Sequence, residues 1–461
     1  AFAINNAEDL YLDSSSIALS VQSVTGGNFE DLDSSDTATV TVGDTTDIVT
    51  ATLSVDRVAL NEGAVDLVYT VTLRDAGGNL APANNTITVS TTQGDITILA
   101  GASTGSISLD VQDDDIYRDG ETVNNVITAI AETNATQANS FESLTFSNTP
   151  VSSVISDTVD TVTATLSVDK TAVSEGAANI TYTVTLTDAL GNLVTAANAI
   201  TVTTTQGIIT IAANASSGTL GKAIQVDDVY VDGETITNAI TAIVEADAGN
   251  AGSLENLVAD NTAVSTVVSD TLDAVTAVLT VSSNGVDEGA VDLVYTVELQ
   301  DANGDPVIAN NIVTVTTTLG VITITAGDSS NTLTIPIQGD DAFIDAETVS
   351  NAITAVVETN AGQANSFENL GYNGTTLVTE ISDTIDTVTL TLNDLTVVEG
   401  SGTAQITASL DSAPQTELTI VLSNGATITF GPAYVAGTDV SSTAFAINNA
   451  EDLYLDSSSI A

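Results

Sequence analysis

The 461-residue sequence contains no cysteine, histidine, methionine or tryptophan. Without cysteine and histidine, disulfides, zinc sites and thiol or imidazole catalysis are excluded. Basic residues are nearly absent: Arg57, Arg74, Arg118, Lys170 and Lys222 stand against 61 acidic residues, a formal net charge of -56. So few cations cannot neutralise phosphates, which excludes nucleic acid as a partner and disfavours an anionic membrane surface.

Long apolar runs and aromatic residues are also scarce. No run approaches the roughly 20 apolar residues of a membrane-spanning helix, so no direct membrane insertion is expected. No signal-peptide pattern opens the chain, an absence that says nothing about export if the sequence is part of a longer protein. High charge with 4% aromatic residues can indicate disorder, but 43% hydrophobic residues contradict that interpretation. The composition favours ordered β-structure.

The sequence is built from repeats. Related stretches that open with VTATLSVD, VTATLSVD and VTAVLTVS begin at residues 49, 162 and 275, each 113 residues after the one before. A more divergent start, VTLTLND, begins at 388 and stops short at 461. The first eighteen residues, AFAINNAEDLYLDSSSIA, return unchanged as the last eighteen, and residues 19–48 continue what stops at 461. The predicted domains are three complete repeats, 49–161, 162–274 and 275–387, flanked by the C-terminal part of a fourth type at 1–48 and its N-terminal part at 388–461; the super-repeat restarts after 443 residues, at 444.

Two interpretations account for the duplicated ends. In the first, the chain is a window from a much longer array, and its partners are the neighbouring repeats of that array. In the second, a subunit with part of a domain at each end completes it with a neighbouring copy, as a donated strand completes an open sheet, and the copies self-associate into filaments. The mass of the intact polypeptide distinguishes the two.

Within each repeat the pattern has a period of two residues. In DLVYTVTL, the side chains of Leu67, Tyr69, Val71 and Leu73 share one face of a strand. Short runs rich in Thr and Val recur between turn clusters such as DAGGN, and no segment sustains a helical period. We therefore predict an all-β protein, a tandem array of immunoglobulin-like antiparallel β-sandwiches in an extended rod.

Counting strands places the acidic residues of a repeat. If successive strands alternate in direction, then Glu62, the run Asp113–Glu121 and the pair Asp157 and Asp160 fall at one pole of the sandwich, where the next repeat begins. Glu142 falls at the opposite pole. Three motifs that are far apart in sequence are thus expected to converge.

Such a convergence needs a cation. Close carboxylates repel by about 1 kcal/mol per pair in water and about 4 kcal/mol at intermediate dielectric. Ca²⁺ resolves this, because it accepts 6 to 8 oxygen ligands at about 2.3–2.6 Å in flexible geometry. The candidate ligands of the three complete repeats are Glu62, Asp114, Asp115, Asp119, Glu121, Asp157 and Asp160; Glu175, Asp227, Asp228, Asp232, Glu234, Asp270 and Asp273; and Glu288, Asp340, Asp341, Asp345, Glu347, Asp383 and Asp386.

The fourth unit departs from this pattern. Asp44, Asp47 and Glu399 are its candidate ligands, but Ser15 and Ser458 stand where the complete repeats have Glu121 and its counterparts. We therefore expect a weaker site, or fewer ions, in that unit.

Two other roles for the acidic residues are open. They can be solvated turn residues that keep exposed strand edges from pairing, which is the interpretation we favour for scattered acids such as Glu245 and Glu298. A glycosidase also uses paired carboxylates. However, the same carboxylates recur in every unit, and there are no aromatic clusters that could bind sugar. We therefore predict that the protein is not an enzyme.

The motifs VSEGAANITYTVTL, DDVYVDGETI, SLENL and SDTLD, in near-identical tandem units over the whole chain, resemble the repeat regions of giant bacterial adhesins of the LapA type, within the repeats-in-toxin group. The VEG and DDxYxDGE elements also resemble Calx-beta modules, whose calcium ions sit at one pole of a sandwich. The resemblance implies a bacterial cell-surface or extracellular spacer, exported by a type I system and stiffened by calcium, that projects an adhesive tip during attachment and biofilm formation.

The chain also differs from complete adhesins of this kind. It has no glycine-rich GGxGxD nonapeptides, no membrane-retention module and no distinct tip domain, so adhesion itself is expected to reside elsewhere. Direct binding of a glycan or another surface ligand by one unit is a further alternative, and an aromatic patch on one unit alone would favour it.

Overall fold

A computed structural model describes residues 2–4, 6–398 and 400–448. The chain divides into two compact units: residues 1–172, 178–224 and 235–267 form the first, and residues 173–177, 225–234 and 268–461 form the second. Two acidic loops of the second complete repeat, at residues 173–177 and 225–234, therefore belong to the unit that contains the third complete repeat. The described residues include no helix, and hence none that could cross a membrane.

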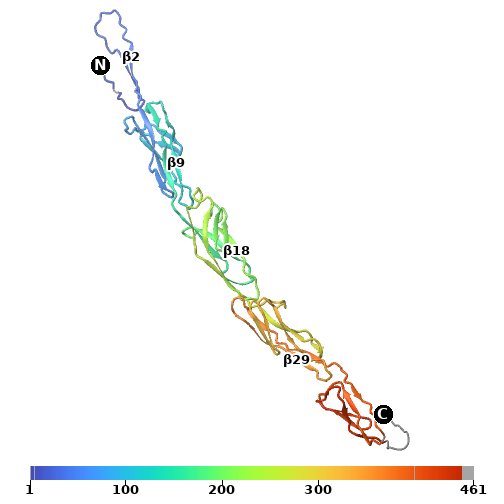
Figure 1. Ribbon diagram of the computed structural model, residues 1–461. Helices are drawn as coiled ribbons and strands as arrows, with labels where there is room; N and C mark the ends of the chain where they lie inside the picture. Colours follow the sequence, from blue (N-terminus) through green and yellow to red (C-terminus); the bar gives the residue numbers. More distant parts are fainter. Residues whose placement is uncertain (1, 5, 399, 449–461) are drawn as a thin grey trace. The chain divides into compact units, whose positions relative to one another are not determined.

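The first complete repeat is a β-sandwich made of ten strands (Figure 1). They are β3 (Ile48–Val55), β4 (Ala59–Asn61), β5 (Leu67–Arg74), β6 (Ile87–Thr91), β7 (Gly94–Ile98), β8 (Thr104–Leu109), β9 (Glu121–Asn125), β10 (Ile127–Glu132), β11 (Ser143–Phe146) and β12 (Val151–Ser156). A four-stranded sheet has the order β11-β3-β5-β8, and two three-stranded sheets have the orders β10-β6-β7 and β4-β12-β9.

Alternating burial explains why these segments become strands. On β5, Leu67, Tyr69, Val71 and Leu73 are fully buried, while the residues between them are partly exposed. The core also receives side chains from β3, β6, β7, β9, β10 and β12, so all three sheets contribute to it. The prediction of all-β immunoglobulin-like sandwiches is thereby confirmed.

Most strand pairs are antiparallel, but two pairs at sheet edges are parallel. β11 lies parallel to β3, with Ser143 opposite Ile48, and β4 lies parallel to β12, with Ile155 opposite Leu60. Neither parallel pair was predicted from the sequence. The strand directions nevertheless agree with the count made there, because β11 only adds a short segment between β10 and β12.

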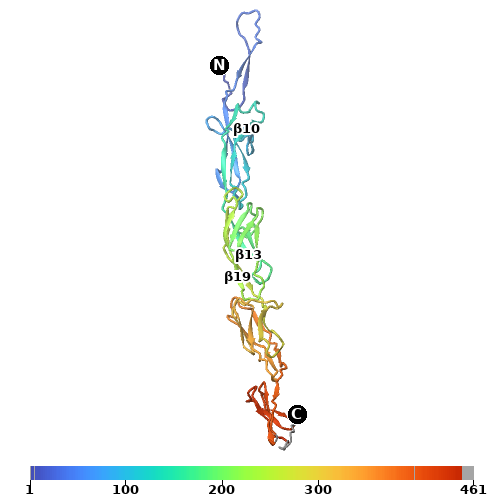
Figure 2. The ribbon, with the colours of Figure 1, turned by 45° about the vertical axis from the view of Figure 1, so that its right-hand side comes forward.

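The second complete repeat has strands with matching positions (Figure 2). They are β13 (Thr161–Val168), β14 (Ala172–Ser174), β15 (Ile180–Thr187), β16 (Ile200–Thr204), β17 (Gly207–Ile211), β18 (Ser217–Lys222), β19 (Glu234–Asn238), β20 (Ile240–Glu245), β21 (Asn256–Ala259) and β22 (Val264–Ser269). In the first unit its sheets have the orders β18-β15-β13-β21 and β17-β16-β20.

The third complete repeat follows the same plan. Its strands are β23 (Ala274–Val281), β24 (Gly285–Asp287), β25 (Leu293–Gln300), β26 (Val313–Thr317), β27 (Val321–Ile324), β28 (Ser330–Ile335), β29 (Glu347–Asn351), β30 (Ile353–Glu358), β31 (Asn369–Tyr372) and β32 (Leu377–Ser382). Its sheets have the orders β28-β25-β23-β31, β24-β32-β29 and β27-β26-β30.

The two flanking segments form smaller structures. The N-terminal segment (residues 1–48) contains a two-stranded hairpin of β1 (Ser15–Ser20) and β2 (Thr37–Val42). The C-terminal segment (from residue 388) contains β33 (Leu390–Leu392), β34 (Thr403–Ala404), β35 (Thr407–Leu410), β36 (Leu418–Val421), β37 (Thr427–Phe430), β38 (Val440–Ser441) and β39 (Phe445–Ala446). Its small core includes Ala408, Leu410, Ile428 and Phe430.

Candidate metal centres at the repeat junctions

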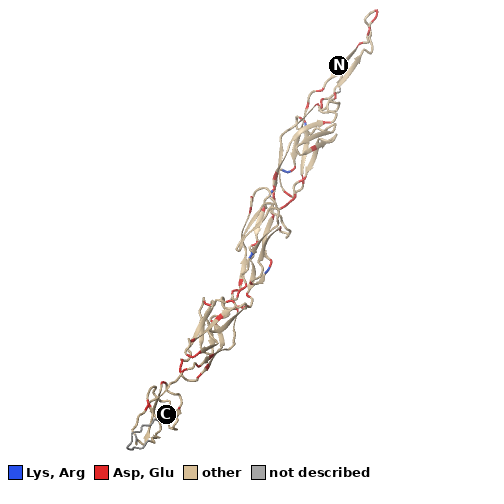
Figure 3. Cartoon of the chain, turned by 90° about the vertical axis from the view of Figure 1, so that its right-hand side faces the viewer, with Lys and Arg blue, Asp and Glu red and all other residues tan. Residues whose placement is uncertain are grey.

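Acidic residues are concentrated in the loops at the ends of the β-domains rather than along the strands (Figure 3). At the end of the first complete repeat, the Glu62 amide donates to the Ser156 carbonyl (3.1 Å) and the Gly63 amide to the Gln112 carbonyl (2.8 Å). Gly63 has a φ of +65°, and a Cβ at this position would lie 2.7 Å from the Cβ of Asp114. Glycine therefore lets the Glu62 loop approach the acidic run closely.

The first cluster of carboxylates lies within one repeat. Glu62, Asp115 and Asp119 each offer an oxygen within 4.8 Å of the others. The Gln112 side chain donates to Asp119 (2.7 Å), and the Asp119 amide donates to Asp157 (3.2 Å). Burial, followed by the charges of Asp115, Glu62 and Asp157, raises the pKa of Asp119. The three motifs predicted to converge thus meet at one pole.

A second cluster joins two consecutive repeats. Glu62 and Asp157 of the first repeat lie within 4.8 Å of Glu255, which comes from the second. The Asp160 amide donates to one Glu255 oxygen (2.6 Å), and the Thr158 amide donates to one Glu62 oxygen (2.7 Å). Burial raises the pKa of Glu255, although the Asp160 amide opposes the rise.

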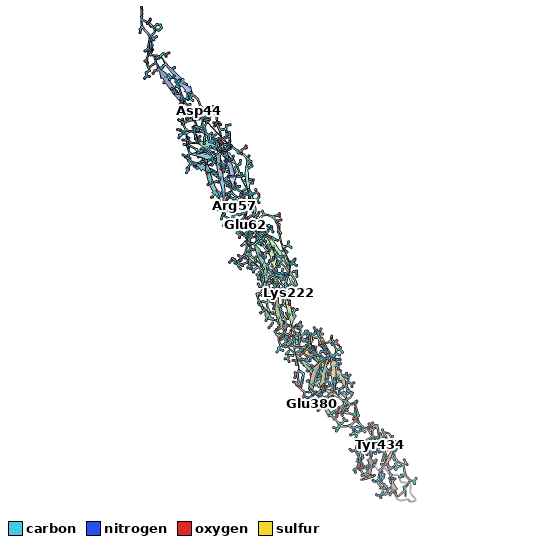
Figure 4. All side chains as sticks on the ribbon, turned by 90° about the vertical axis from the view of Figure 1, so that its left-hand side faces the viewer. Asp44, Arg57, Glu62, Lys222, Glu380 and Tyr434 are labelled. Atoms are coloured by element: carbon cyan, nitrogen blue, oxygen red, sulfur yellow. The ribbon has the colours of Figure 1, made fainter. Side chains whose placement is uncertain are left out.

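Each of these two glutamates keeps one oxygen without a partner. Glu62 is 4% exposed and Glu255 is 6% exposed, and both Oε2 of Glu62 and Oε1 of Glu255 are buried without a hydrogen bond. A buried anionic oxygen without a donor is costly, and two in one cluster also repel. A bound cation would satisfy both, so the side chains present fit a metal ion. Figure 4 shows Glu62 near one end of the first repeat and Asp44 near the other.

Neutral contacts also hold this junction together. Tyr117 forms an antiparallel bridge with Leu254, and its hydroxyl donates to the Thr195 carbonyl (2.6 Å). The Arg118 amide donates to the Ser253 carbonyl (2.8 Å). Backbone hydrogen bonds therefore join the acidic loop of the first repeat to the segment of the second repeat that carries Glu255.

The junction before the first repeat has the same design. Glu8, Asp47 and Glu142 form a cluster within 4.8 Å, and the Asp47 amide donates to Glu142 (2.6 Å). The ring of Tyr11 stacks on Phe141 with centroids 5.3 Å apart. The N-terminal segment thus contacts the first repeat through the same kinds of acidic and aromatic contact.

In the second unit, Glu175 belongs to two clusters. One contains Asp228 and Asp232. The other contains Asp270 of the second repeat and Glu368 of the third repeat. The Asp273 amide donates to Glu368 (2.6 Å). Glu175 Oε2 and Glu368 Oε1 are buried without a partner.

Burial and the adjacent Glu175 carboxyl raise the pKa of Glu368 to about 7, against the opposing effect of the Asp273 amide. The ring of Tyr230 stacks on Phe367 at 5.5 Å, and its hydroxyl donates to the Ile308 carbonyl (2.6 Å). The glutamate from the third repeat therefore sits beside an apolar contact that fixes its position.

The acidic pole of the third repeat has the same internal geometry. The Thr384 amide donates to Glu288 (2.9 Å), whose other oxygen is buried without a partner, and the Asp345 amide donates to Asp383 (3.1 Å). Burial, followed by the charges of Asp341, Glu288 and Asp383, raises the pKa of Asp345.

The remaining predicted ligands lie in three kinds of position. Asp114, Asp227 and Asp340 accept hydrogen bonds from the hydroxyls of Thr158, Thr271 and Thr384, respectively. Asp160, Asp273 and Asp47 offer their amides to the glutamate of the following repeat. Glu121, Glu234 and Glu347 open strands and are exposed, and Glu121 lines a groove of about 450 Å³ together with Asp157 and Glu255.

In the fourth unit, Asp44 accepts a hydrogen bond from the Asp13 amide (3.2 Å). Asp386 is exposed. Glu399 and Ser458 lie outside the described residues. Ser15, the predicted departure, opens β1 where Glu121 opens β9.

Three glutamates of the junctions were missing from the predicted ligand set: Glu142, Glu255 and Glu368. Their signal was in the sequence, since SFESL, SLENL and SFENL recur every 113 residues. Strand counting placed Glu142 at the pole opposite Glu62. In a tandem array that pole meets the acidic pole of the preceding repeat, which is where the structure places Glu255 beside Glu62.

The donor atoms limit which cation suits these clusters. All side-chain ligands are carboxylate oxygens, and no His or Cys exists in the chain. Oxygen-only sites suit hard cations, and flexible loops with several carboxylates suit Ca²⁺ better than Mg²⁺, which demands near-ideal octahedral geometry and keeps its waters. When bound, Ca²⁺ would neutralise the charge and be held by glutamates from two repeats.

Comparison with known proteins gives a family match over nearly the whole chain. Residues 2–45, 47–158, 160–271, 273–384 and 386–461 each match the family described as the LapA domain. No curated protein matches significantly.

Several solved structures are similar to the chain. One is a tetra-tandem repeat in the extending region of a large adhesion protein, with 16% identity, 88% of this chain and 91% of that chain covered, and a TM-score of 0.21. Another is invasin, a bacterial integrin-binding protein, with 15% identity, coverage of 86% and 79%, and a TM-score of 0.24. A third is CBD12 from CALX1.2, with 9% identity, coverage of 48% and 100%, and a TM-score of 0.19.

Proposed function

The chain belongs to the LapA domain family, as its repeated motifs indicated, and from this premise we propose that it is a calcium-stiffened structural spacer of a giant cell-surface adhesin. In this role the repeats extend the protein and hold an adhesive tip away from the cell for attachment and biofilm formation. The spacer has no catalytic activity of its own.

One observation carries the proposal: consecutive repeats each place a glutamate with a buried, unpaired oxygen in the same cluster. Glu62 and Glu255 form one such pair, and Glu175 and Glu368 form another. Without a cation the two carboxylates repel and oppose the contact between repeats. A cation bound between them attracts both carboxylates, and this attraction exists only while the two repeats keep their mutual orientation.

The proposed location outside the cell supports calcium as the ion. A bacterial surface protein exported by a type I system meets calcium outside the cell, where modular sites with dissociation constants of roughly 0.1 to 1 mM are useful. The absence of cysteine means that the repeats need no oxidative folding step on the way. Their excess negative charge keeps such arrays soluble and non-aggregating.

The test combines thermal unfolding with small-angle X-ray scattering on the full chain, in millimolar calcium and in excess chelator. Calcium should raise the melting temperature and lengthen the particle. The variant Glu175→Gln, which alters two clusters at once, should weaken both responses, whereas Glu380→Gln, at an exposed position of β32, should leave them unchanged. If calcium changes neither stability nor length, the carboxylates are solvated surface groups and the stiffening mechanism is wrong.

A further inference from the structure

A further glutamate recurs in each complete repeat, and in two of the repeats it is buried. Glu245 was expected to be a solvated turn residue, but it ends β20 and is only 5% exposed, so that expectation is wrong. Its counterpart in the third repeat, Glu358, ends β30 and is also 5% exposed. Glu132 of the first repeat ends β10 and is partly buried. A buried acidic group that returns every 113 residues needs a structural reason.

Both oxygens of Glu245 face hydrogen-bond donors. The Leu254 amide donates to Oε2 (3.0 Å), and the side-chain amide of Asn198 donates to Oε1 (3.4 Å). The same two kinds of donor surround Glu358, at 2.9 Å and 3.2 Å. An ionised carboxylate only accepts hydrogen bonds, so it satisfies both donors. Glutamine has one acceptor oxygen and would leave one buried donor unpaired.

The bond to Leu254 fixes the segment of the second repeat that meets the first repeat. The chain leaves β20 in a loop and returns to Glu245 nine residues later, at Leu254. Leu254 forms the bridge with Tyr117 of the first repeat, and the next residue, Glu255, donates its amide to the Ile116 carbonyl (3.1 Å). These contacts therefore depend on where the main chain of Leu254 lies.

The buried glutamate also lies near the tyrosine of the preceding repeat. Burial, followed by the charges of Asp115 and Glu245, raises the pKa of Tyr117. In the second unit, burial followed by the charges of Asp228 and Glu358 raises the pKa of Tyr230. Each of these glutamates thus lies behind the surface on which the preceding repeat docks.

We propose that Glu245 is a positioning residue for the junction between the first and second repeats. Its carboxylate holds the main chain of Leu254 and thereby sets the carboxylate of the next residue, Glu255, beside Glu62. Glu358 holds Phe367 and thereby sets Glu368 in the same way. The positioning residue acts through the main chain and does not bind the cation itself. This inference rests on the proposed function, in which calcium bridges glutamates of two repeats.

Hydrogen–deuterium exchange of the full chain, followed by mass spectrometry during a calcium titration, tests this role. The Asp160 amide donates to Glu255 and the Asp273 amide donates to Glu368, so their segments report on the two junctions separately. Glu245→Gln should raise the calcium concentration at half-protection of the Asp160 segment by about tenfold, the usual cost of losing a group that orients a metal ligand. The Asp273 segment of the same molecules should keep the midpoint of the parent chain.

A second substitution should restore the response. When Asn198→Asp is added to Glu245→Gln, the glutamine oxygen can accept from the Leu254 amide while its amide group donates to the new carboxylate at position 198. Both hydrogen bonds are then present again, and the midpoint of the Asp160 segment should return close to that of the parent chain. The control for stability is Val184→Ala, which removes fully buried atoms from β15, in the other sheet of the same repeat, and should not shift the midpoint.

An unchanged midpoint in Glu245→Gln, or an equal rise in Val184→Ala, would overturn the proposal, because Glu245 would then serve stability alone. Failure of the proposed function would look different, since calcium would protect neither the Asp160 nor the Asp273 segment of the parent chain. In that case exchange in chelator decides. Glu245→Gln should still speed exchange at residues 252–255, and unchanged exchange there would refute the positioning role.

Discussion

Replacing Glu368 by glutamine should have opposite effects with and without calcium. The pKa of Glu368 is raised to about 7 from 4.5, chiefly because partial burial desolvates the carboxyl, with the Glu175 carboxyl beside it. Each tenfold change in proton affinity corresponds to about 1.4 kcal/mol. In metal-free buffer at pH 8 the ionised group therefore opposes folding by about 3 kcal/mol, as an upper bound.

Glutamine removes this penalty and keeps the acceptor for the Asp273 amide. Its amide group can also donate to the unpaired oxygen of Glu175. Glu368→Gln should therefore stabilise the metal-free chain by up to about 3 kcal/mol, and at about 4 °C per kcal/mol its unfolding transition should rise by roughly 10 °C. In calcium the same variant lacks a charged ligand and should unfold at a lower temperature than the parent chain.

The stability of the metal-free chain should fall as the pH rises through the pKa of Glu368. A carboxyl whose pKa is raised in the folded state stabilises folding fully below its unfolded pKa of about 4.5, and this contribution is lost as the pH rises through about 7. The metal-free parent chain should thus gain stability between pH 8 and pH 5, and Glu368→Gln should flatten that dependence. Differential scanning calorimetry in chelator and in calcium measures both, with Glu380→Gln as the control. A variant that is destabilised in chelator as well would refute the idea that the two carboxylates repel at this junction.

Two further predictions concern the neutral parts of the junctions. Tyr230→Phe removes the hydroxyl that donates to the Ile308 carbonyl but keeps the stacked ring, so urea titration should show a loss of about 1 kcal/mol in the unit that holds the third repeat; no loss would mean that this hydrogen bond contributes nothing. Gly63→Ala would place a Cβ 2.7 Å from Asp114, whereas Gly78→Ala shares the positive φ but meets no atom within 4 Å. Thermal unfolding should show a larger loss for Gly63→Ala, together with weaker calcium binding by isothermal titration calorimetry, and equal effects would mean that the close approach is not needed.

The sequence was sufficient to predict the strands that alternate over many residues. β5 reads LVYTVTLR, and its buried residues are those that the two-residue period selected. β11 escaped prediction because it has only four residues, SLTF, whose burial does not alternate clearly, and because its parallel partner lies about 95 residues earlier in the chain. No local pattern contains information about such an edge pairing.

The candidate site was predictable within one repeat and not between repeats. Glu62, Asp115 and Asp119 were brought together by counting strand directions, which depends only on short connections. Glu255 belongs to the following repeat, and its place beside Glu62 depends on how two domains dock, which no count within a domain describes. Glu121 shares the recurrent spacing of the ligands; it begins β9, is exposed and lines a groove with Asp157 and Glu255, so its role as a ligand stays a prediction.

The direction of the first and last strands of a repeat has a mechanical consequence. In the first repeat the chain enters beside Glu142, where β3 begins parallel to β11, and leaves beside Glu62, where β12 ends parallel to β4. Tension applied along the backbone therefore pulls β3 and β12 lengthwise against their partners and loads several hydrogen bonds of each ladder simultaneously in shear. Pulled in this way a strand cannot peel off one bond at a time, so each repeat is built to resist force in the direction in which the chain runs.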